Sequence, residues 1–157
     1  MEARINLFEN EVAGKFVKRL IAASRPIEES TLPKATQELV KIRASQINGC
    51  GVCLDMHTKD AAHQGETALR LNLVAAWREA TVYTEAERAA LALAEEGTRL
   101  ADTHHGVTDE TWAEVRKHHD DEQIGALIVL VATINAWNRL NVIARNPAGD
   151  YEPGMWS

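Results

Sequence analysis

The 157-residue sequence contains few residues that break helices or strands. It contains four prolines, nine glycines and no low-complexity run, and its composition of 45% apolar and 25% charged residues is typical of a folded globular protein. Disorder over a long segment is therefore not expected. The length suits one domain with a proper hydrophobic core, so we predict a single domain over residues 1–157.

An excess of basic residues and a long apolar run are also missing. The net charge is -6, which disfavours nucleic acid as a partner. We find no apolar segment that approaches the roughly 20 residues needed to span a bilayer, and the first ten residues, MEARINLFEN, are charged where a signal peptide is apolar. We expect a cytoplasmic protein with no membrane partner. In that reducing compartment, a close pair of cysteines is more often metal-binding or catalytic than a structural disulfide.

Alternating β-branched runs are absent, whereas apolar residues recur at spacings of three and four, as in amphipathic helices. We therefore predict an all-α fold. The first helix is expected over residues 9–24, ending before Pro26. Its buried face is predicted to contain Val12, Phe16, Leu20 and Ala23.

Capping residues and breaks predict the other helices. Expected N-terminal caps are Thr31, Thr84 in a capping box with Glu87, Thr108, and Asp120 in a capping box with Gln123. The stretch NGCG separates the second helix from the third, which places Cys50 at a helix start. The last helix is apolar on nearly every side, so it is central or shared with another subunit. Residues 146–157 are predicted to be a C-terminal tail.

Both cysteines lie in the stretch NGCGVCLDMH, residues 48–57. On a helix, Cys50, Cys53 and His57 share one face within about one turn of each other. The helix N-terminus favours a thiolate at Cys50, whereas an imidazole four residues on favours Cys53 as the reactive thiol. Spacing alone does not choose between the two sulfurs. Either way, the pair can close into a disulfide after oxidation.

A carboxylate precedes this pair by twelve residues. Glu38 neighbours Ile42 and Ser45 at the edge of the apolar arc of the second helix, so we expect it to be partly buried. Burial raises the proton affinity of a carboxylate, which makes Glu38 a candidate proton donor or acceptor.

The segment ELVKIRASQINGCGVCLDMHTKDA, residues 38–61, resembles the core motif of the AhpD-like alkylhydroperoxidases in the carboxymuconolactone decarboxylase superfamily. The pattern E-x11-C-x2-C-x3-H, with SQINGC and DMH around it, is much more specific than a lone C-x-x-C. The resemblance continues less sharply through YTEAERAALALAE and NAWNRLNV. It covers most of the chain after Pro33, which gives a core of about residues 33–145.

The resemblance implies an all-α AhpD-like fold that assembles as a homotrimer or homohexamer, and a thiol-dependent peroxidase without a cofactor. In the family's scheme Cys53 attacks the hydroperoxide and Cys50 resolves the sulfenic acid to a disulfide. His57 and Glu38 occupy the positions of the proton relay. Val52 stands where the best-studied members carry a histidine. The thiol electron donor is open, and a dihydrolipoyl protein is one candidate.

Other uses of the same residues remain as alternatives. The pair could serve as a thiol-disulfide oxidoreductase, as an oxidant sensor, or as two small apolar residues in a core. A zinc site would combine Cys50, Cys53 and His57 with Glu38 or His63. Family members without the cysteine pair are decarboxylases, and the intact pair argues against that reaction.

Two further groups of polar residues are expected to be structural. The pairs His104-His105 and His118-His119 are predicted to lie on the solvated surface. In NAWNRLN, the buried amides and the arginine of an apolar helix need partners, which favours a structural or subunit-interface role over catalysis.

Overall fold

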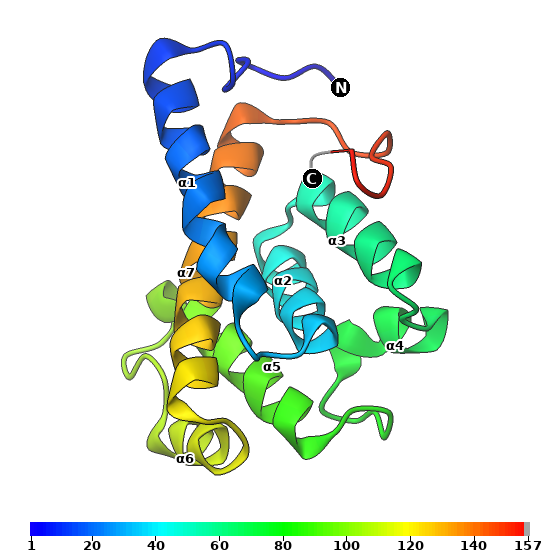
Figure 1. The fold of residues 1–157 in the computed structure, drawn as a ribbon, viewed down its shortest axis with the longest axis vertical. Coiled ribbons are helices and arrows are strands. Elements are labelled where there is room, and N and C mark those ends of the chain that lie inside the picture. Colours follow the sequence, from blue (N-terminus) through cyan, green and yellow to red (C-terminus); the bar gives the residue numbers. More distant parts are fainter. Residues whose placement is uncertain (156–157) are drawn as a thin grey trace.

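The computed structural model describes residues 1–155, a range that contains helices and no strand, so the prediction of an all-α fold is confirmed. Figure 1 shows the helices in chain order. They are α1 (Glu11–Glu29), α2 (Lys34–Asn48), α3 (Gly51–His63), α4 (Ala68–Leu73), α5 (Glu85–Thr98), α6 (Asp109–His118) and α7 (Asp121–Ala144), with 3-10 turns η1 (Val74–Ala76) and η2 (Leu100–Asp102).

Helix α2 lies between two apolar clusters. It packs against α3, α5 and α7. Its Val40 belongs to the cluster shared with α5, α6 and α7, whereas Leu39 and Ile42 belong to a second cluster with Trp77 and Leu91. Because both of its sides are covered, polar residues of α2 are carried into the interior with the apolar ones.

The predicted helix starts are confirmed where a side chain caps them. Thr84 and Asp120 each form a capping box, with Glu87 and Gln123 respectively, and Thr108 accepts a hydrogen bond from a backbone N–H at the start of α6. The start of α2 differs from its prediction, because the cap position is Pro33 and it provides no side-chain hydrogen bond.

Helix α7 corrects the expectation that no apolar segment is long enough to span a bilayer. Its 24 residues are sufficient by length and composition to cross a membrane, and 39% of its apolar window is buried within this chain. The helix packs against α1, α2, α3 and α5. Its partners in this chain thus cover only part of its apolar surface.

Helix α1 differs from the prediction in its length and in its buried face. It runs through Pro26, which sacrifices one backbone hydrogen bond without ending the helix. Its buried residues are Gly14, Val17 and Ile27, whereas Val12 is 79% exposed and Phe16 is 51% exposed. The predicted apolar face was wrong because spacing identifies an apolar stripe but does not show whether this chain covers it.

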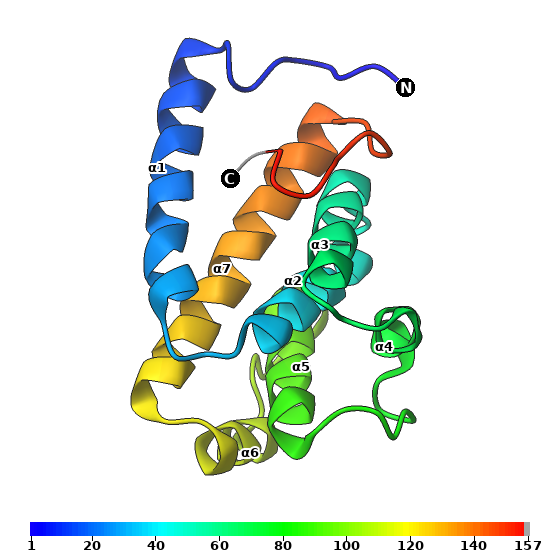
Figure 2. The same cartoon turned by 45° about the vertical axis from the view of Figure 1, so that its right-hand side comes forward.

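The described part of the segment predicted as a tail loops back beside α3, as Figure 2 shows. Asp55 accepts hydrogen bonds from the backbone N–H groups of Gly149 at 2.7 Å and Tyr151 at 3.2 Å. The Lys59 ammonium donates to the carbonyls of the same two residues, and Tyr151 donates from its hydroxyl to Asp60 at 2.8 Å. These bonds hold Gly149 and Tyr151 against α3 between Asp55 and Asp60.

Candidate active site

A tight turn between α2 and α3 places the first cysteine. Gly49 adopts the left-handed conformation with φ 67°, which glycine accepts without steric cost. The N–H groups of Gly49 and Cys50 then bond to the carbonyls of Gln46 and Ser45, which is the Schellman pattern of a helix end. Cys50 is therefore the N-cap of α3, as the stretch NGCG predicts.

Cys50 and Cys53 are joined by a disulfide at the start of α3. The two residues are buried, with 1% and 2% of their surfaces exposed. Val52 between them is half-buried. The sulfurs lie at the positive end of the α3 macrodipole, where a thiolate is stabilised once the disulfide is reduced.

Glu38 and His57 meet in the interior, although they lie on different helices. His57 Nδ1 is 2.9 Å from Glu38 Oε2, and the ammonium of Lys41 donates to the other carboxylate oxygen at 2.8 Å. Both Glu38 and His57 are buried. Among residues 1–155, no group of three histidine, cysteine, aspartate or glutamate side chains is arranged so that it could hold a metal ion.

The charge state of Glu38 contradicts its sequence-based expectation. Burial raises the pKa of this carboxyl, but the hydrogen bond with His57 and the charge of Lys41 outweigh it and lower the pKa to about 2. Burial lowers the pKa of His57, against the opposing effect of Glu38. A carboxylate only accepts hydrogen bonds, so the shared proton belongs to Nδ1 and the Nε2 lone pair of the neutral ring is left to accept a proton.

A residue of NAWNRLN, for whose amides the sequence favoured a structural role, contacts Cys53. Asn141, near the end of α7, donates from Nδ2 to Cys53 Sγ at 3.5 Å. Its own carboxamide oxygen accepts from Asn146 at 2.7 Å. A signal was present in the sequence, because Asn141 follows Asn138 by three positions in an apolar helix and thus shares its inward face.

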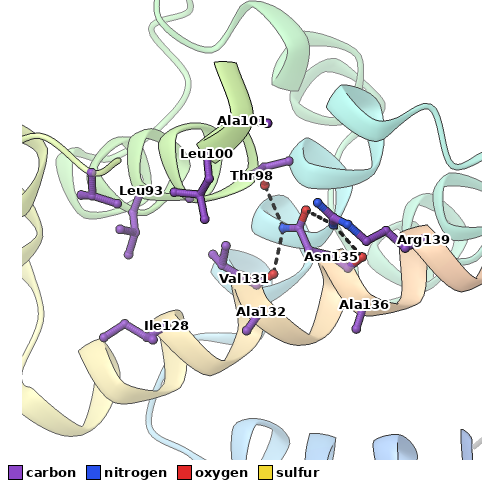
Figure 3. Close-up of a pocket in the computed structure, with 12 residues that line it drawn as sticks. Leu93, Thr98, Leu100, Ala101, Ile128, Val131, Ala132, Asn135, Ala136 and Arg139 are labelled. Atoms are coloured by element: carbon purple, nitrogen blue, oxygen red, sulfur yellow. Dashed lines mark hydrogen bonds between the residues drawn. The ribbon is translucent and has the colours of Figure 1, made fainter. Parts of the chain in front are cut away.

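The other amides of α7 tie the helices together, consistent with the structural role predicted for NAWNRLN. Asn48 donates to both Asn135 and Asn138, at 2.9 and 2.8 Å, and Asn138 donates to Ser45 at 3.0 Å. Arg139 donates to Asn135 beside an apolar groove of about 640 Å³ between α7 and the α5–η2 end (Figure 3). The part of α7 that lines the groove, from Ile128 to Arg139, therefore precedes Asn141, which contacts Cys53.

The histidine pairs divide between surface and interior. His104 and His105 are exposed as predicted. His119 is buried, with Nε2 3.1 Å from the carbonyl oxygen of Ala86, and His118 is half-buried, so the prediction for this second pair was wrong. The end of α6 is covered by α5, which a polar local sequence does not reveal.

The helical fold, with a Cys-x-x-Cys disulfide at a helix start, defines an AhpD-like helical protein. The solved structure of ATU0492 from Agrobacterium tumefaciens, provisionally assigned as the antioxidant defence protein AhpD, superposes with a TM-score of 0.87 at 36% identity, covering 96% of this chain and 100% of that chain. The carboxymuconolactone decarboxylase family matches residues 13–96, and the chain belongs to this family.

Two further proteins are similar to this chain in sequence or in fold. The protein YdfG of Bacillus subtilis (strain 168) is 38% identical over 148 residues, which is 94% of this chain and 98% of that protein. The debrominase Bmp8 has a TM-score of 0.72 at 20% identity over 87% of this chain and 74% of its own, which shows a shared fold. The fold is thus shared with at least one enzyme, but a shared fold does not by itself determine the chemistry of this chain.

Proposed function

We propose that this protein is a thiol-dependent peroxidase that reduces hydroperoxides through Cys53 and Cys50. The observation that carries the proposal is the buried Cys50–Cys53 disulfide on the helix that also carries His57, whose ring bonds to Glu38. A dithiol, a neutral base and an ionised carboxylate that orients this base are the parts that such a reaction needs.

In the first step His57 accepts the thiol proton of Cys53, and the thiolate attacks the terminal oxygen of the hydroperoxide. The O–O bond breaks, the sulfur is oxidised to a sulfenic acid, and the leaving alkoxide takes the proton from His57 to become an alcohol. Glu38 holds Nδ1 protonated throughout, so the proton moves at Nε2. Lys41 keeps Glu38 ionised and thereby supports the same tautomer.

In the second step Cys50 attacks the sulfenic sulfur of Cys53. The S–S bond forms, and hydroxide leaves with the Cys50 proton as water. The disulfide of this structure corresponds to the product of that step. A dithiol donor then reduces the disulfide in two exchanges, restoring both thiols and becoming oxidised itself. A dihydrolipoyl protein would supply this chemistry.

We place this reaction in the cytoplasm and in a homotrimer or homohexamer. The family resemblance implies the assembly, and the exposed apolar side chains support it. Val12 and Phe16 on α1, and Ile128 and Ile143 on α7, are each at least half exposed. Apolar patches of this kind are typical of surfaces that a partner covers.

The proposal is tested by mixing reduced protein with cumene hydroperoxide in a stopped-flow instrument and following the loss of thiols. The wild type should consume one peroxide per chain and form the Cys50–Cys53 disulfide. Cys53→Ser should consume none, whereas Cys50→Ser should consume one and stop at a sulfenic acid that dimedone labels. Wild-type protein that consumes no peroxide and forms no disulfide would refute the peroxidase function.

Thiol–disulfide exchange is the second candidate, because the disulfide alone would suffice for it. It predicts that reduced protein transfers its electrons to a disulfide substrate while leaving the hydroperoxide untouched. Oxidised lipoamide can react with the reduced protein under either function, so the hydroperoxide arm of the stopped-flow experiment separates the two.

A further inference from the structure

We propose that Asn141 is a further residue of the active site, which holds the Cys53 sulfur in place and stabilises its thiolate through the carboxamide N–H. The proposal rests on the proposed role of Cys53 as the attacking thiol. The Asn141 carboxamide donates to this sulfur at 3.5 Å, although the two residues are 88 positions apart in the sequence.

The orientation of the Asn141 carboxamide is fixed by a second amide. Its oxygen accepts a hydrogen bond from Asn146 Nδ2 at 2.7 Å, and a carboxamide whose oxygen faces one way presents its N–H groups on the opposite side. The group at Cys53 is therefore the donor and not the acceptor. An acceptor there would repel a thiolate, whereas a donor attracts it.

The turn at the end of α7 explains why Asn146 reaches Asn141. Arg145 adopts the left-handed conformation with φ 60°, and the N–H groups of Arg145 and Asn146 bond to the carbonyls of Val142 and Asn141. This is the same Schellman pattern that presents Cys50 at the end of α2. The two turns are neighbours, since a Cβ placed on Gly51 would lie 3.3 Å from Ala148.

Burial of Cys53 increases the effect of this hydrogen bond on the stability of the thiolate. Cys53 is 2% exposed, so water has little access to compensate for a missing donor. A sulfur in a disulfide is a weak acceptor, whereas a thiolate carries a full charge and forms the stronger, charge-assisted bond. The Asn141 donor therefore favours the ionised thiol over the neutral one, in addition to the macrodipole of α3.

The test measures the thiol directly and needs no peroxide. In a Cys50→Ser background, the rate of Cys53 alkylation by iodoacetamide is followed between pH 5 and 10. Asn141→Ala should shift the profile to higher pH and slow alkylation at pH 7 about tenfold. Asn141→Asp should shift it further, because a carboxylate replaces the donor. Asn146→Ala should give a smaller shift, since Asn141 remains but is free to rotate.

Asn72→Asp is the matched control, because it makes the same amide-to-carboxylate change at an exposed position of α4 and should leave the profile unchanged. Thermal melts establish that each variant is folded. An unaltered profile in folded Asn141→Ala overturns the proposal, whatever Asn141→Asp does. A shifted profile in a protein that reduces no peroxide would keep the role of Asn141 at the thiol and remove only the peroxidase function.

Discussion

Single residues of the site owe their properties to neighbours on other helices. Glu38 is more deeply buried than the partial burial predicted from its sequence position, yet His57 and Lys41 lower the pKa of its carboxyl to about 2 and keep it ionised. Burial acts on His57 in the opposite sense to its effect on a carboxyl and lowers the pKa, which keeps the ring neutral. The pair is thus set to accept a proton at neutral pH.

These two groups should make the protein sensitive to acid. Each has a lower pKa in the folded chain than its ordinary value of 6.5 for His57 or 4.5 for Glu38, so the unfolded chain binds more protons as the pH falls. The contribution of these two groups to the free energy of unfolding is therefore fully present at neutral pH. We predict that the free energy of unfolding, measured by urea denaturation, decreases as the pH falls below 6.5 and decreases again between 4.5 and about 2.

A variant assigns the first part of this decrease. His57→Gln removes the titrating ring and should flatten the slope between pH 6.5 and 5, while the other histidines of the chain remain. If wild type and His57→Gln lose stability in parallel over this range, the ring is not buried in its neutral form and the proposed base loses its support.

At the scale of elements, two helix ends bring the site together. The turn after α2 delivers Cys50, and the turn after α7 delivers Asn146 to Asn141. Both depend on one residue in the left-handed conformation, which is glycine in the first turn and arginine in the second. A side chain in this conformation costs roughly 1–2 kcal/mol, so the second turn is held against a backbone preference.

Substitutions at these two positions should therefore have unequal effects. Gly49→Ala has open space for its Cβ, so its cost is conformational, and it should reduce the free energy of unfolding by about 1 kcal/mol. Arg145→Gly removes the same conformational cost. It should therefore not reduce the free energy of unfolding, although glycine adds entropy to the unfolded chain. Urea denaturation of both variants tests this, and equal destabilisation would argue against the left-handed turn at Arg145.

At the scale of the whole molecule, this chain leaves apolar faces exposed. Helix α7 has Ile128 half exposed at the groove of Figure 3, and α1 shows Phe16 on its outer side. Burying such side chains is worth about 1.5–3 kcal/mol each. An assembly of identical chains is therefore the proposed state in solution.

We predict that the wild type sediments as a trimer or hexamer at micromolar concentration, and that Ile128→Glu shifts it toward smaller species by placing a charge in the covered groove. Lys18→Glu, a charge reversal at an exposed position of α1, serves as the control and should leave the assembly intact. A wild type that sediments as a monomer would contradict the proposed assembly. If Ile128→Glu leaves the oligomer intact, the groove at Ile128 is not part of the subunit interface.

The sequence predicted the local features well. Capping boxes, the break at NGCG and the helical spacing of apolar residues involve neighbours within a few positions, and the helices that they predict are present. The buried face of α1 and the depth of His119 were missed, because both depend on which distant helix covers which side.

By itself, the sequence determined the helices and the family pattern, and it placed two cysteines and a histidine on one helical face, because helix periodicity is a local property. Only the tertiary structure decided that Glu38 has a lowered pKa and is bonded to His57, and that Asn141 faces Cys53. Charge states and hydrogen bonds depend on distances between groups, and these distances are set by packing between helices that are far apart in the chain.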